Sequence, residues 1–170
     1  MEMQKNQEQL WNDCKKVFQK AKNEHTDYLL KDIIEIIRLY REPLDSVADY
    51  NDLEYVNNMN ASDYITGTNG DNFEILLSAF LKNSKPSLDD IWKMLSQLVW
   101  DLSVVVSTEL CPNCKCDYIS YYTDETKTHL YESCVNCFWT VENGKQIKRP
   151  DELYPTTKSF LMDKKKICNI

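Results

Sequence analysis

Apolar residues recur at spacings of three and four along the first hundred residues, which is the pattern of amphipathic helices. The first apolar stripe lies in residues 9–25, and a second, more strongly apolar one lies in residues 26–42. Thr26 is suited to cap the second helix, because its hydroxyl can accept from a free backbone N–H of the first turn. Pro43 is expected to end that helix, since proline has no N–H to donate. Two successive helices therefore open the chain.

Two further helices are expected before residue 107. The segment 70–83 carries Asp71 as a potential N-cap and Glu74 at the reciprocal position of a capping box. Ser87 and Asp90 form the same pattern at the start of the fourth helix. The fourth helix is apolar over a wide face, which predicts a central place in a helical bundle.

Residues 44–70 interrupt this periodicity. They are rich in Asn, Asp, Ser and Gly, and Asn69-Gly70 is a turn signal. The segment is longer than most loops in compact domains. It is therefore expected to hold a short helix near residues 49–57 or to serve as a functional loop.

The last third of the chain has the composition of strands and turns. Residues 116–123 and 129–134 are rich in β-branched and aromatic side chains, and residues 137–141 form a shorter third run. Val104–Val106 could end the fourth helix or start a strand, because a short apolar run fits both. A loop and a short helix over about residues 156–166 are expected to follow.

Four of the seven cysteines form two CxxC pairs separated by nineteen residues: Cys111, Cys114, Cys134 and Cys137. Each pair can supply two thiolates from one tight turn, and two such turns complete the tetrahedral set that zinc prefers. The alternatives are a redox dithiol, for which no βαβ pattern surrounds either pair, and four cysteines with no shared role. Metal binding is the interpretation that the spacing favours.

With these residues the segment 109–148 resembles the four-cysteine zinc ribbon, a family in which two CxxC knuckles hold a small three-stranded sheet. The resemblance implies a structural Zn²⁺ held by the four thiolates, with no open position for a substrate. Cys116 is interpreted as a bystander, with a role as an alternative ligand left open. Cys14 lies on the apolar stripe of the first helix and is expected in the core. His129 is expected to be solvated.

The predicted fold class is therefore α+β, with an N-terminal bundle of about four helices and a C-terminal four-cysteine zinc ribbon. The expected domains are a helical domain at residues 1–108, the zinc ribbon at 109–148, and a tail with a short helix at 149–170. No Gly-, Pro- or Ser-rich linker separates the first two, so the ribbon is expected to dock on the helices.

The net charge is −7, and its excess of acid is concentrated in one segment. Residues 42–81 contain no Lys or Arg but eight acidic residues: Glu42, Asp45, Asp49, Asp52, Glu54, Asp63, Asp71 and Glu74. Such a surface either solubilises the chain or attracts a basic partner. We predict a protein-binding module that inhibits or scaffolds a basic protein. The expected contact residues are Asp45, Asp49, Tyr50, Asp52, Glu54, Tyr55 and Asp63.

In charge and size alone, the chain resembles the immunity proteins that neutralise bacterial nuclease toxins. That resemblance implies inhibition of a basic toxin domain as the most concrete form of the prediction. The alternative is a nucleic-acid-binding or transcription-associated zinc-ribbon protein. It would use aromatic side chains beside Lys145, Lys148 and Arg149 to stack bases: Tyr118, Tyr121, Tyr122, Tyr131 and Trp139. The acidic balance disfavours this alternative, and these aromatics are instead expected to pack the sheet against the helical part.

No sequence motif of an enzyme is found, whether HExxH, a phosphate-binding loop, a dinucleotide fingerprint or a nucleophile elbow. The acids of "DYNDLE" lack the spacing and glycine of a calcium loop. With two histidines in the chain, a general base has few candidates, so we expect a protein that is not an enzyme. The polar N-terminus and the absence of a long apolar run predict a cytoplasmic location, where thiols stay reduced.

Overall fold

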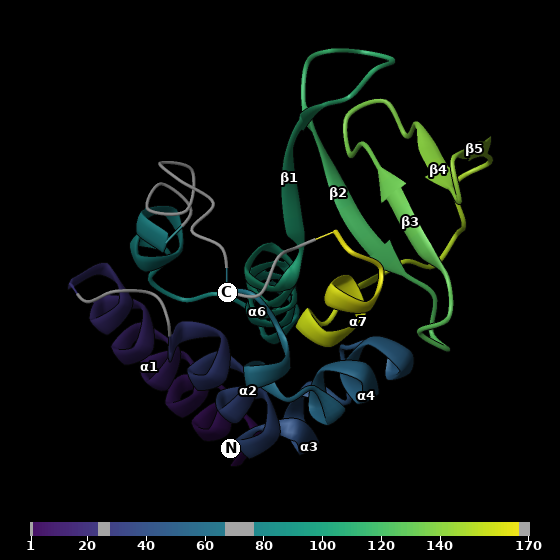
Figure 1. Cartoon of the computed structure of the whole chain (residues 1–170). Helices are drawn as coiled ribbons and strands as arrows, with labels where there is room; N and C mark the ends of the chain where they lie inside the picture. Colours follow the sequence, from purple (N-terminus) through teal and green to yellow (C-terminus); the bar gives the residue numbers. More distant parts are fainter. Residues whose placement is uncertain (1, 24–27, 67–76, 167–170) are drawn as a thin grey trace. The chain divides into compact units, whose positions relative to one another are not determined.

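The computed structural model describes residues 2–23, 28–66 and 77–166 (Figure 1). The chain combines α-helices with one antiparallel sheet, which confirms the expected α+β class. Three sequence features lie outside the described residues: the Thr26 cap, the Asn69-Gly70 turn and the capping box at Asp71 and Glu74. His25 and Cys168 also lie outside them.

The chain forms two compact units. The N-terminal unit comprises Met1–Ser62 and Thr68–Leu102, and the C-terminal unit comprises Asp63–Gly67 and Ser103–Ile170. Each unit has a secondary structure of its own kind, helical in the first and mainly strand in the second.

The N-terminal unit is mainly helical in the residues that the structure describes. Helix α2 contacts α1, α3 and α4, and α1 also contacts α3 (Figure 1). Their bounds are α1 Glu2–Asn23, α2 Leu29–Leu39, α3 Arg41–Leu44, α4 Tyr50–Asn58 and α6 Leu88–Ser103, with a further helical turn at 77–82. The short helix expected near residues 49–57 is confirmed as α4.

The second helix ends earlier than Pro43 predicts. Helix α2 stops at Leu39, and Tyr40 leaves helical geometry with φ −109° and ψ 26°. The short helix α3 then begins at Arg41, so Pro43 lies in its first turn. A proline is tolerated there because the first N–H groups of a helix have no partner within it.

The apolar stripes predicted from the sequence form the core of this unit. The largest fully buried side chains include Phe18 of α1, Leu30 and Ile33 of α2, and Leu95 of α6. Cys14 is fully buried among them, as expected for a core cysteine. Burial raises the pKa of the Cys14 thiol to about 12, so it is neutral and unreactive at physiological pH.

Helix α6 starts at the predicted capping box. The backbone N–H of Asp90 donates to the Ser87 hydroxyl at 3.1 Å, and the backbone N–H of Ser87 donates to the Asp90 carboxylate at 2.9 Å. These two bonds satisfy donors that the helix itself leaves free. The helix ends at Ser103, and Val105 begins a strand, which resolves the ambiguity of the valine run.

The C-terminal unit is built on one antiparallel sheet with the strand order β1-β2-β3-β4-β5 (Figure 1). The strands are β1 Val105–Leu110, β2 Tyr118–Thr123, β3 Leu130–Ser133, β4 Thr140–Glu142, β5 Lys145–Ile147 and β6 Tyr154–Pro155. Strand β6 pairs with the end of β2, where Tyr122 faces Pro155. Helix α7, Lys158–Asp163, follows and lies within the helix expected at about residues 156–166.

Three of the aromatic side chains considered for base stacking are buried in this unit. Tyr121, Tyr122 and Tyr131 are each less than 10% exposed. Tyr122 and Tyr131 pack with Leu153, which brings the segment after β5 against the sheet. These three tyrosines therefore take part in the packing of the C-terminal unit itself. The expectation that they pack the sheet against the helical part stays a prediction.

Candidate metal centre

The first CxxC motif forms a tight turn between β1 and β2. The backbone N–H of Lys115 donates to the carbonyl of Cys111 at 2.9 Å, and the N–H of Cys111 donates to the carbonyl of Asp117 at 2.7 Å. Lys115 takes the left-handed conformation, with φ 54°. This turn, residues 111–116, is the first knuckle.

The second CxxC motif repeats this geometry between β3 and β4. The backbone N–H of Phe138 donates to the carbonyl of Cys134 at 3.0 Å, and the N–H of Cys134 donates to the carbonyl of Trp139 at 2.9 Å. Phe138 is left-handed, with φ 59°. This turn, residues 134–139, is the second knuckle. The strand pairing of β2 with β3 brings the two knuckles to the same end of the sheet.

The four cysteines of the two motifs lie together. Their sulfur atoms are all within 4.8 Å of one another. Cys111 Sγ is 3.6 Å from Cys137 Sγ, and Cys114 Sγ is 3.7 Å from Cys134 Sγ. A disulfide would need about 2.05 Å. Sulfurs placed about 2.3 Å from one tetrahedral zinc ion are about 3.8 Å apart. The cluster therefore fits a metal ion and not a pair of disulfides.

The two cysteines of the second knuckle differ in environment. Cys137 accepts hydrogen bonds from the Asn113 side-chain Nδ2 at 3.3 Å and from the Trp139 backbone N–H, which lower the pKa of its thiol to about 6. Burial raises the pKa of the Cys134 thiol to about 12, although the backbone N–H groups of Asn136 and Cys137 donate to its sulfur. Metal binding requires thiolates, so it displaces the Cys134 proton.

Burial differs between the two cysteines of each knuckle. Cys111 and Cys134, the first cysteine of each motif, are fully buried, whereas Cys114 and Cys137 are partly exposed. A site closed by four thiolates has no position for a substrate or an activated water. The arrangement can hold a metal and join four strands, but it offers no reactive coordination position.

Two other residues considered for metal binding lie outside the cluster. Cys116 is exposed, and its thiol donates to the carbonyl of Cys114 at 3.1 Å. His129 Nδ1 lies 2.5 Å from Glu142 Oε1, and the His129 ring stacks on Tyr131. His129 is exposed, as expected, and its contact with Glu142 links the residue before β3 to the end of β4.

Four of the seven residues predicted to contact a partner are exposed in the N-terminal unit. Asp45 follows α3, Asp49 caps α4 by accepting the Asn51 backbone N–H at 2.9 Å, and Asp52 lies in the first turn of α4. Tyr50 is 67% exposed at the start of the same helix. The structure thus brings an aromatic ring and acidic groups to one end of α4.

The other three have different surroundings. Glu54 is paired with Arg41 at 2.7 Å and accepts from the Asn58 side chain at 3.0 Å. Tyr55 is half-buried. Asp63 is exposed but belongs to the C-terminal unit. Arg41 lies immediately before residues 42–81, the segment that contains no Lys or Arg. Its guanidinium supplies the positive charge that pairs with Glu54.

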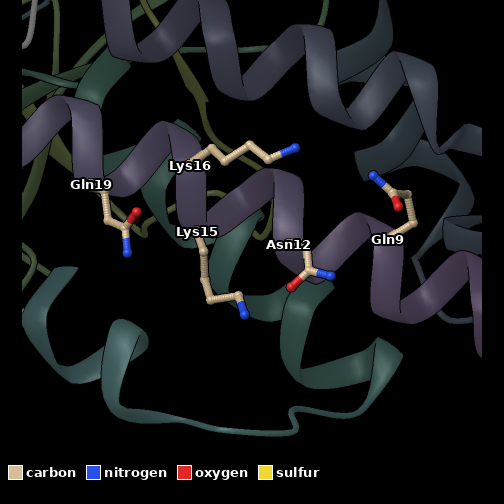
Figure 2. Close-up of a pocket in the computed structure, with 5 residues that line it drawn as sticks. All are labelled: Gln9, Asn12, Lys15, Lys16 and Gln19. Carbon is tan, nitrogen blue, oxygen red and sulfur yellow. The ribbon is translucent and has the colours of Figure 1, made fainter.

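A polar hollow of about 380 Å³ lies against α1 (Figure 2). Its lining residues are amides and lysines: Gln9, Asn12, Lys15, Lys16 and Gln19. Asn12, Lys15 and Gln19 extend to the same side of the helix (Figure 2). The described residues that line it include no carboxylate and no histidine.

The role of Asn113, whose amide reaches a cysteine of the other knuckle, was not predicted from the sequence. The available signal was the repetition of Asn before the second cysteine of each motif, at Asn113 and Asn136. The sequence also gave no sign that Arg149 stacks on two rings, 5.2 Å from the centre of Phe138 and 5.8 Å from that of Tyr122.

Comparison of the chain with protein-family models, with curated proteins and with solved structures found no match. Among the residues that the structure describes, no helix combines the length and apolar character needed to cross a bilayer.

Proposed function

We propose that the protein is a binding module whose C-terminal unit is fixed by one structural zinc ion and whose N-terminal unit presents an acidic surface to a basic protein partner. Cys111, Cys114, Cys134 and Cys137 would hold the ion. The spacing of their sulfurs supports this assignment, and a full set of four thiolates supports a structural and non-catalytic role.

The metal would stabilise a small sheet that has few buried apolar residues. The knuckles link β1 to β2 and β3 to β4, so one ion fixes both connections. Strands β4 and β5 have three residues each, which is too short to be stable alone. Because the site forms only when the chain folds, the free energy of metal binding adds to the stability of this unit.

The single observation that carries the partner-binding proposal is Tyr50, an aromatic residue 67% exposed beside the exposed acids Asp45, Asp49 and Asp52. Tyrosine anchors are enriched among the residues that dominate binding energies at interfaces. Clustered carboxylates raise the rate of association with a basic protein and disfavour acidic competitors. We define Asp45, Asp49, Tyr50 and Asp52 as the acidic surface.

The chemistry of the acidic surface suits inhibition or scaffolding of a basic protein. A nuclease domain is one such protein, because it carries cations that bind phosphates. Carboxylates can bind those cationic side chains in place of the phosphates of a nucleic acid. Immunity against a bacterial toxin domain is therefore the most concrete form of the proposal.

The test uses the full chain as bait with matched charge variants. The variant Asp45→Asn/Asp49→Asn/Asp52→Asn removes three charges from the acidic surface, and the change Asp49→Asn keeps a side chain able to cap α4. The control Glu125→Gln/Asp151→Asn/Asp163→Asn removes the same charge from exposed positions of the C-terminal unit. A partner captured by the wild type is purified, and its affinity and association rate are measured at low and moderate salt.

We expect the acidic-surface variant to slow association at least about tenfold at low salt, with little change in the control. Tyr50→Ala should accelerate dissociation, because it removes an anchor and leaves the charge unchanged. Equal effects of the two triple variants would contradict the proposal. Salt-sensitive binding of oligonucleotides by the wild-type chain would favour the nucleic-acid alternative, which we place second because three of its five stacking aromatics are buried.

A further inference from the structure

Asn113 makes a hydrogen bond that crosses between the two knuckles. It belongs to the first knuckle, and its Nδ2 lies 3.3 Å from Sγ of Cys137 in the second. A thiolate can accept a hydrogen bond but cannot donate one, so the NH₂ end of the carboxamide must face the sulfur. The backbone hydrogen bonds given above for each knuckle do not reach the other knuckle.

The second knuckle has an asparagine at the matching position. Asn113 and Asn136 both precede the second cysteine of their motif, and both are exposed. The backbone N–H of Asn136 donates to Cys134 within its own knuckle. The two asparagines thus share residue type, position and exposure, and the bond to Cys137 distinguishes Asn113.

A donor at this place has an electrostatic purpose. Four thiolates around one divalent ion leave a net charge of about −2, and N–H groups that point at sulfur stabilise this charge. Cys137 is only partly buried, so water and chelators can reach it more easily than the fully buried Cys111 and Cys134. The Asn113 amide donates to this more accessible ligand without adding a charge.

We propose that Asn113 is a positioning residue that holds the Cys137 thiolate in the metal site and joins the two knuckles into one unit. The inference rests on the proposed metal site and adds to it the residue that controls loss of the ion. Removal of outer hydrogen-bond partners of metal ligands typically weakens metal binding by roughly 10- to 100-fold. The same loss is expected when Asn113 is removed.

The test compares Asn113→Ala and Asn113→Asp with Asn136→Ala and Asn136→Asp in the full chain. Co²⁺ is titrated against a competing chelator, with the sulfur-to-cobalt charge-transfer absorption as the readout. Asn113→Ala should weaken Co²⁺ binding roughly 10- to 100-fold, and Asn113→Asp more, because its carboxylate faces a thiolate. The matching changes at Asn136 should alter the affinity less than about threefold. Circular dichroism of the zinc-loaded variants checks that each one folds.

A second readout follows the reactivity of single thiols in the zinc-loaded protein. Alkylation and peptide mass spectrometry should show Cys137 reacting well before Cys114, the other partly exposed ligand, in Asn113→Ala. In the wild type and in Asn136→Ala, Cys114 and Cys137 should react at similar rates. Cys116, which is exposed and outside the site, should react early in every variant. This order would not change if Asn113 merely stabilised the fold.

The possible results distinguish a failure of the role assigned to Asn113 from a failure of the proposed metal site. Equal effects at Asn113 and Asn136, or an unchanged order of alkylation, would overturn the role of Asn113 and leave the metal site in place. A wild-type chain that binds no Co²⁺ would overturn the metal site and the inference with it.

Discussion

Lys115 and Phe138 occupy the same position in the two knuckles and share a left-handed backbone, with φ 54° and 59°. Each follows the second cysteine of its motif, and each N–H closes the turn onto the first cysteine. A residue other than glycine loses roughly 1–2 kcal/mol in this conformation. The cost at both positions is consistent with turns shaped to present sulfur atoms.

Lys115→Gly should therefore stabilise the zinc-loaded protein by up to about 1 kcal/mol, because glycine adopts positive φ without steric cost. Lys115→Val should destabilise it, since a β-branched residue is poorly tolerated in that conformation. Thermal unfolding in the presence of zinc measures both changes. Phe138→Gly is the matched comparison and should gain less, because it also removes the ring on which Arg149 stacks. A lower stability of Lys115→Gly would argue against the left-handed turn.

Ser87→Ala should lower the stability of the helical unit by about 1 kcal/mol, because the hydroxyl that accepts the Asp90 backbone N–H is lost. Ser96→Ala is the control within the same helix. The Ser96 hydroxyl donates to the carbonyl of Lys93 and caps nothing, so its loss should be neutral or slightly stabilising. Denaturant unfolding followed by far-ultraviolet circular dichroism distinguishes the two. Similar losses in both variants would rule out the capping role of Ser87.

Asp124 organises the hairpin between β2 and β3. Burial opposes its ionisation, but donors from Thr126, Thr128 and the backbone N–H of His129 outweigh burial and hold the pKa of Asp124 well below its usual range. A folded-state pKa below the unfolded value of about 3.9 stabilises the fold at higher pH. That contribution is complete above the unfolded pKa and is lost as the pH falls through about 3.9 toward the folded pKa.

Asp124→Asn should therefore lower stability by about 1–2 kcal/mol at neutral pH and reduce its decline below about pH 4, since the charged acceptor is gone. Urea unfolding at a series of pH values measures this, with the exposed neighbour changed in Glu125→Gln as the control. If Asp124→Asn lost as much stability at acid pH as the wild type does, Asp124 would not be the source of that loss.

Local sequence signals were sufficient where a single turn or stripe determines the structure. The Ser87 and Asp90 pattern predicted the start of α6, because both partners lie in one helical turn. The CxxC spacing predicted which cysteines gather, since each motif can form a turn that presents two sulfurs. Cys14 was placed in the core by its position on an apolar stripe.

Features that depend on pairing between distant segments could not be predicted in the same way. The strand at Val105 forms because it pairs with Tyr121, a contact that the valine run alone does not encode. The residues of β2 are buried on both faces, so the alternation that would separate inner from outer tyrosines is absent. The bond of Asn113 to Cys137 exists only when the two knuckles meet.

The metal content of the purified full chain, measured together with its near-ultraviolet circular dichroism, tests the central claim most directly. We predict one zinc per chain, and a loss of both the ion and the signal of the buried tyrosines when zinc is removed by a chelator. Cys111→Ser and Cys134→Ser should behave like the chelated protein, whereas Cys116→Ser should retain zinc. A chain that contains no metal and keeps the full tyrosine signal would contradict the account.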